Sequence, residues 1–235
     1  MYQQSPYAAP SGRAAVAYGA DTRERFLVKT YNHLFGAIAL FTLIEIALFK
    51  TGLAPAIAQA LLGTSWLVVM GGFLVVAWIA SRVAHSTQSL PAQYLALLAY
   101  VVVEAIIFVP LLFIADRFAP GAIQSAALVT ILGFAGLTGL VFWTRKDFSF
   151  LGAVLRWIGF GVLALIIASV IFGFSLGTLF SVGMVVFAGA AILYDTSNVL
   201  HHYPEDRYVG AALELFASVA LLFWYVLRIF ISSRD

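Results

Sequence analysis

The chain has 235 residues, of which 63% are hydrophobic and 10% charged, with a formal net charge of +2 and no cysteine. A soluble domain carries about 25% charged residues, so this composition excludes an ordinary globular protein. The small, dispersed charge argues against nucleic-acid binding, and the lack of cysteine excludes disulfides, thiol catalysis and zinc–thiolate sites.

The chain begins with a polar segment and continues as a series of apolar ones. Residues 1–25 lack the apolar core of a signal peptide and are predicted to form a disordered cytoplasmic tail. Residues 26–235 form a predicted transmembrane domain, because each apolar segment is long enough to cross a hydrocarbon core of about 30 Å as a helix. The predicted spans are Tyr31–Phe49, Trp66–Ser81, Ala92–Ala115, Ala122–Thr144, Gly152–Phe172, Leu176–Val199 and Gly210–Ile231. The sequence therefore predicts an all-α, polytopic membrane protein with seven helices in the lipid bilayer.

Basic residues predict the orientation, since loops on the inner side of a membrane are enriched in Lys and Arg. With the N-terminus inside, the inner side holds Arg13, Arg23, Arg25, Lys29, Arg82, Arg145, Lys146, Arg156 and Arg207. The outer side then holds only Lys50, Arg117, Arg228 and Arg234. We therefore expect a cytoplasmic N-terminus and a C-terminus outside.

Three charged residues from three spans are predicted to lie at one depth, near the inner face. Arg82 ends the second span, Asp195 lies near the end of the sixth, and Glu214 lies about one turn into the seventh. Arg82 has an ordinary explanation in snorkelling to the headgroups, and Glu214 has one in the positive N-terminal end of its helix. Asp195 has neither, because the helix dipole disfavours a negative charge near a C-terminal end. Asp195 is thus the leading candidate for a functional residue.

Glu104 is a second kind of candidate, because it lies near the middle of the third span. A charge there costs about 2.5–3.5 kcal/mol on insertion scales. Glu104 is therefore either protonated or faces a wet cavity, which a kink at Pro110 would help to open. Glu45 lies nearer the outer end of the first span, where reaching the interface is an equally good explanation.

Catalytic motifs are missing from the sequence. There is no nucleophile-elbow serine, no His-x-x-x-His pair and no glycine-rich nucleotide loop. Intramembrane aspartyl proteolysis needs two aspartates on facing helices, and Asp195 alone lies within a span. We expect no enzyme.

Two motifs carry a resemblance to a known family. "RKDFSFLG" (Arg145–Gly152) follows the fourth span, and "ILYDTSNVL" (Ile192–Leu200) ends the sixth. With these motifs, and from "FLVKTYNHLFGAIAL" to "LFWYVLRIF", the chain resembles the Bax inhibitor-1 (transmembrane Bax inhibitor motif) family, whose bacterial members include calcium-leak proteins. The resemblance implies a bacterial inner-membrane protein in which the other six helices enclose the last one.

The resemblance also implies a site. In that family two aspartates on the sixth and seventh helices share a proton and gate a calcium leak, and an arginine on the second helix locks the closed form. Asp195 matches the first aspartate, Arg82 lies near the arginine, and Ser218 takes the place of the second aspartate. Glu214, one turn before Ser218 on the same helix face, is the candidate replacement partner. Asp195, Glu214, Ser218 and Asn198 would offer calcium too few oxygens for tight storage but enough for a transient step, so no tightly bound cofactor is expected.

Three functions are consistent with these features. The first is a cation leak, for calcium, modulated by pH through Asp195, with Glu104 and Asn198 lining a pore or cavity. The second is a non-conducting scaffold that acts through membrane protein partners in stress responses or protease modulation. The third, an intramembrane enzyme, would require turnover of a lipid or peptide that depends on Asp195.

Overall fold

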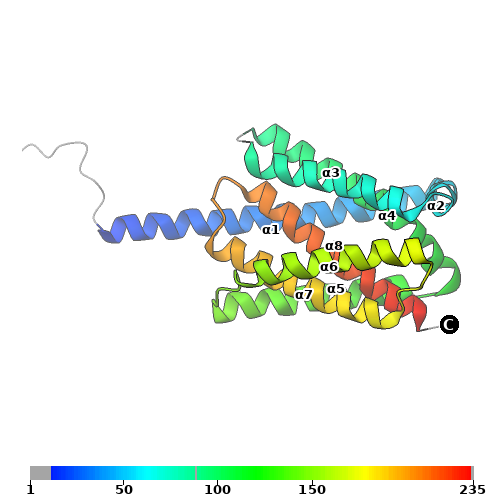
Figure 1. Ribbon diagram of the computed structural model, residues 1–235. Coiled ribbons are helices and arrows are strands. Elements are labelled where there is room, and N and C mark those ends of the chain that lie inside the picture. The colour runs from blue at the N-terminus through cyan, green and yellow to red at the C-terminus, as the bar shows by residue number, and fades with distance from the viewer. Residues whose placement is uncertain (1–11, 88, 234–235) are drawn as a thin grey trace, which may run out of the picture.

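The computed structural model describes residues 12–87 and 89–233, and this part of the chain forms eight helices (Figure 1). They are α1 (Gly12–Lys50), α2 (Ala54–Leu62), α3 (Trp66–Ser86), α4 (Leu90–Phe118), α5 (Ala122–Thr144), α6 (Leu151–Phe172), α7 (Thr178–His201) and α8 (Tyr208–Ser232). Every helix except α2 is long and apolar enough to cross a membrane. The predicted all-α fold with seven spans is therefore confirmed.

The N-terminal segment differs in part from the prediction of a disordered tail over residues 1–25. Residues 1–11 lie outside the described part of the chain, but α1 is already helical from Gly12. The stretch after Gly12 is rich in alanine, the strongest helix former, and no proline separates it from the apolar span. The first candidate span consequently begins at Thr22 rather than at Tyr31.

Helix α2 has nine residues, which are too few to cross a bilayer, so the sequence did not predict it as a span. Pro55 lies in its first turn, where a missing N–H has no helical partner to lose. Ala54 and Ala58 are buried and form a small cluster with Val109 of α4. This helix covers the end of the bundle at which α1 finishes.

Helix α8 is the centre of the bundle, as the family resemblance implies. It packs against α1, α3, α4, α5 and α7 (Figure 1). Its buried residues come from all sides of the helix. Helix α6 is peripheral, because it packs mainly on α7 and has no buried residue of its own. Five helices therefore surround α8 directly, while α6 covers α7 from outside.

The connections divide between the two ends of the bundle. The α3–α4, α5–α6 and α7–α8 connections lie at the end near Thr22, which we call the three-loop end. The opposite end carries α2 and the C-terminal end of α8 (Figure 1). Arg207 of the α7–α8 connection hydrogen-bonds the carbonyl of Thr87, which fastens two of these connections to each other.

Candidate functional site

The hydroxyl of Ser218 on α8 donates a hydrogen bond of 2.5 Å to the Asp195 carboxylate on α7. Both residues are buried, each with 8% of its surface exposed. Hydrogen bonds to charged groups are about twice as strong as neutral ones, and a buried carboxylate needs such partners. Asp195 and Ser218 are therefore joined by a direct hydrogen bond between α7 and α8.

Glu214 extends this site by one turn of α8 toward the three-loop end. Its Oε1 lies 3.0 Å from Nε2 of His85 on α3. Asp195 and Glu214 are close enough for their carboxylates to repel each other, although Ser218 and not Glu214 provides the hydrogen bond to Asp195. Three helices thus contribute polar groups to one region, with Asp195 at its buried end.

Tyr203, in the α7–α8 connection, completes the outer part of the site. Its hydroxyl hydrogen-bonds Nε2 of His85, the same nitrogen that faces Glu214. Burial, and then the negative charge of Glu214, raise the pKa of the Tyr203 phenol. The phenol therefore stays neutral, and His85 links it to the Glu214 carboxylate.

Arg82 is not brought into this cluster. Its side chain is exposed, and its guanidinium lies 5.7 Å from the ring centroid of Trp78, one turn back on α3. Within the described residues, no ion pair joins Arg82 to Asp195 or Glu214. His85 occupies the place beside Glu214 instead, and the sequence missed it because the second span was predicted to end at Ser81 whereas α3 continues to Ser86.

Arg23 is a further residue that sequence reasoning missed. From α1 its guanidinium donates three hydrogen bonds to the last carbonyls of α7 and the following connection: Val199 at 2.7 Å, Leu200 at 3.2 Å and Tyr203 at 2.5 Å. The last four carbonyls of a helix lack helical partners and carry the negative end of its dipole, so a cation is favoured there. Assigning Arg23 to a disordered tail concealed this role.

The two sequence motifs contact each other at the three-loop end. Arg145 ends α5 with a positive φ of 49°, and the loop that follows turns Asp147 toward α7. The Ser197 hydroxyl donates to Asp147 at 3.3 Å and accepts the Phe148 N–H at 2.8 Å, and His202 lies 3.4 Å from Asp147. The N–H of Ser149 also donates to Asp147 and is the main reason why its pKa lies below the ordinary range. The α5–α6 loop is thereby fixed to α7 two residues from Asp195.

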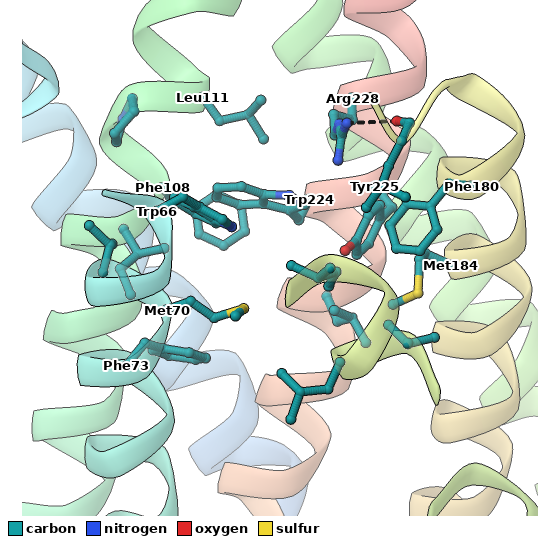
Figure 2. A pocket seen from close by; sticks show the side chains of 18 of the residues that line it. Trp66, Met70, Phe73, Phe108, Leu111, Phe180, Met184, Trp224, Tyr225 and Arg228 are labelled. Carbon is teal, nitrogen blue, oxygen red and sulfur yellow. Dashed lines mark hydrogen bonds between the residues drawn. The ribbon is translucent and has the colours of Figure 1, made fainter. Parts of the chain in front are cut away.

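Glu104 lines a cavity of about 560 Å³, while Asn198 does not. This cavity lies between α3, α4, α6, α7 and α8. Figure 2 shows it with Trp66, Phe108 and Trp224 on one side and Arg228 at one end, where the Arg228 guanidinium donates a hydrogen bond of 3.0 Å to the carbonyl of Leu176. The Asn198 carbonyl instead accepts backbone N–H groups that close the end of α7. Glu104 therefore lies beside a cavity with mostly apolar walls, in a helix that runs unbroken through Pro110.

The carboxylates of the site do not form a metal-binding cluster. Across the described residues, no group of three or more His, Asp or Glu side chains is arranged to hold a metal ion. Asp195 and Glu214 alone supply two carboxylates, fewer oxygens than the six to eight that calcium takes. Any ion that passes this site would need water for most of its ligands.

Comparisons with known proteins agree with the resemblance. The family model described as "Inhibitor of apoptosis-promoting Bax1" matches residues 23–235. An uncharacterized protein of Pseudomonas aeruginosa is 39% identical over 109 residues, which is 46% of this chain and 49% of that protein. The Bax inhibitor 1 of Schizosaccharomyces pombe is 33% identical over 118 residues, covering 48% of this chain and 43% of its own length.

A longer match links the chain to a plant protein. The BI1-like protein of Arabidopsis thaliana is 28% identical over 225 residues, 91% of this chain and 83% of its own length. The aligned part of the chain spans about half the length of the Pseudomonas and fission-yeast relatives. Because the family model covers almost all of the described residues, the chain belongs to the Bax inhibitor-1 family of membrane proteins.

Proposed function

We propose that this protein is a pH-sensitive cation leak with calcium as its cargo, gated by the protonation of Asp195. The observation that carries the proposal is the 2.5 Å hydrogen bond from Ser218 to Asp195, a buried contact between α7 and the central helix α8. An acid in this position changes the charge of the helix interface whenever it gains or loses a proton. Such a change alters both the attraction of the interface for cations and the hydrogen bond that joins the helices.

Ser218 suits this role because a hydroxyl serves both charge states of the acid. It donates to the charged carboxylate, and it accepts from the protonated one by rotating its own hydrogen. Glu214 supplies a second negative charge one turn away, so proton loss at Asp195 produces a pair of like charges that a cation relieves. Few protein ligands mean weak binding, which conduction requires.

We further propose that the protein resides in a bacterial inner membrane with its N-terminus in the cytoplasm. The relative from Pseudomonas aeruginosa supports the bacterial setting. Most Lys and Arg residues gather at the three-loop end, which supports that end as the cytoplasmic one.

Reconstituted protein tests the proposal. Full-length protein in liposomes that contain a calcium indicator is expected to pass calcium, with a flux that changes between about pH 5 and pH 8. Asp195→Asn should abolish this pH dependence, while Asp206→Asn, at an exposed position in the α7–α8 connection, should retain it. A wild-type pH profile in Asp195→Asn would reject the gating role of Asp195.

A second function has one observation in its favour. Ser218 stands where the family pattern has the second aspartate, and this departure suits a non-conducting scaffold that acts through membrane protein partners. A complete absence of flux from the folded wild-type protein, together with a specific partner recovered by crosslinking in the native membrane, would establish this alternative instead.

A further inference from the structure

A second cavity, of about 370 Å³, lies between α1, α4, α5 and α8, away from the Asp195 site. Its walls are mostly apolar, and four phenylalanines line it: Phe41, Phe49, Phe216 and Phe223. Ile46 and Ile131 on its border are exposed on the flank of the bundle, so a molecule dissolved in the bilayer can reach it. Its size is within the range of pockets that hold small organic ligands.

Polar groups without partners converge on this apolar cavity. Glu45 is 7% exposed and Thr130 is 3% exposed. Both carboxylate oxygens of Glu45 and the hydroxyl of Thr130 are buried and have no hydrogen-bond partner among the described residues. Leaving such groups unpaired in an apolar setting costs free energy comparable to a lost hydrogen bond or more. A ligand that brings donors to Glu45 and Thr130 would recover this free energy.

The chemistry of the cavity selects the ligand. Three unpartnered oxygens match the three N–H donors of a primary ammonium group, whose charge would also offset that of Glu45. Asp116, exposed at the border of the cavity, adds a second carboxylate, and the phenylalanine rings favour a nearby cation. A bare calcium ion fits poorly, because it takes six to eight oxygens and these walls are largely hydrocarbon.

We propose that this cavity binds a hydrophobic primary amine, with its ammonium group on Glu45 and Thr130 and its apolar body between the phenylalanines. The proposal does not depend on the leak function, because Glu45 and Thr130 lie on α1 and α5 and the Asp195 site lies on α7 and α8. It assigns a binding role to the one buried acid whose two carboxylate oxygens both lack a hydrogen-bond partner among the described residues.

Glu104 provides a matched control for this proposal. It is also 7% exposed and also lines a cavity, the one in Figure 2. Unlike Glu45, however, it has a hydrogen-bonding neighbour, Tyr100, and only one of its oxygens lacks a partner. Substituting Glu104 therefore removes a carboxylate of the same type and the same exposed fraction without touching the proposed amine site.

The experiment measures the binding of radiolabelled decylamine to the full-length protein in phosphatidylcholine nanodiscs. We expect saturable binding that Glu45→Gln weakens by at least about tenfold and Thr130→Val by severalfold, because each removes a partner of the ammonium group. Glu104→Gln should bind as the wild type does. Decyltrimethylammonium, which has the same charge but no N–H donor, should bind more weakly than decylamine.

Two results would overturn the proposal. The first is unchanged decylamine binding in folded Glu45→Gln, which would indicate partition into the bilayer alone. The second is an equal loss in Glu45→Gln and Glu104→Gln, which would indicate a general effect of removing a buried carboxylate. If Glu45→Gln does not fold, Thr130→Val and the trimethylammonium comparison decide in the same way. Nanodiscs containing phosphatidylethanolamine distinguish the source of the amine. Competition by this lipid identifies an aminophospholipid headgroup, and undiminished binding identifies a free amine.

Discussion

Gly152, in the first turn of α6, lies against the ring of Tyr194 on α7, and a Cβ built at Gly152 would be 2.5 Å from Tyr194 Cε2. Gly152 ends one family motif, and Tyr194 precedes Asp195 in the other. The contact therefore fixes the position of the α5–α6 loop relative to the candidate site, and only glycine allows it.

Gly152→Ala should lower the melting temperature, because the Tyr194 ring must move. Overpacking of this kind costs about 1–3 kcal/mol. Thermal unfolding of the purified protein measures the effect, and Tyr194→Leu in the same chain should recover much of it. Gly161→Ala on the same helix is the control, since no atom lies within 4 Å of a Cβ there. Equal effects of the two alanines would contradict this reading of the contact.

Ser218 can be tested in two directions. Ser218→Ala leaves the buried Asp195 carboxylate without its hydroxyl donor and should destabilise the protein by about 1–3 kcal/mol. Ser218→Asp restores the pair of aspartates in the family pattern and should give calcium flux a different pH dependence, because two adjacent acids titrate as a unit. Ser169→Ala is the matched control, since Ser169 hydrogen-bonds only a carbonyl of its own helix. A Ser218→Ala protein as stable as Ser169→Ala would contradict the importance of the bond.

Arg23→Gln should destabilise the three-loop end, because the carbonyls of Val199 and Leu200 in α7 and of Tyr203 in the following connection lose a cationic donor. The expected loss is about 1.5–3 kcal/mol, the range for hydrogen bonds to charged groups. Hydrogen exchange of the amides in the α7–α8 connection reports it directly. Arg156→Gln removes an exposed charge from α6 and should leave this exchange unchanged.

Asp147→Asn should lower the stability of the folded protein by an amount that depends on pH, and the sign of this dependence follows from the lowered pKa of Asp147. A carboxyl whose pKa is depressed by folding stabilises the folded state above its ordinary value of 3.8 and loses that contribution as the pH falls through the lower folded value. The wild type should therefore unfold at a higher temperature than Asp147→Asn at pH 7 and at pH 5. The difference should shrink below about pH 4 as Asp147 becomes protonated. A difference that grows on acidification would contradict the assignment.

Orientation can be tested cleanly because the chain contains no cysteine. Single substitutions at exposed positions, Glu24→Cys near the three-loop end and Ser233→Cys beyond α8, place one thiol at each end of the bundle. A membrane-impermeant maleimide added to intact cells should label Ser233→Cys and not Glu24→Cys. The reverse pattern would place the N-terminus outside.

The fold was accessible from sequence because lipid imposes a strong and local rule. Each span must satisfy its own backbone hydrogen bonds and present apolar side chains to hydrocarbon, so length and hydropathy alone locate the helices. The errors lie where this rule is weak. The predicted second span stopped at Ser81 because Arg82 is charged, whereas α3 continues through His85 to Ser86. Likewise, α2 was missed because nine residues are too few to span a bilayer.

By itself the sequence determined the seven spans, the family motifs and the unusual position of Asp195, since these depend on residue types and their spacing along one chain. Only the tertiary structure decided the partners: Ser218 bonds Asp195, His85 faces Glu214, Arg23 caps α7, and Arg82 lies over Trp78 away from them all. The physical reason is that helix rotation and tilt are set by packing between helices. Arg82 and His85 lie one turn apart on α3, and only His85 meets the Glu214 carboxylate on α8. The hydropathy of the sequence does not show which of the two side chains faces α8.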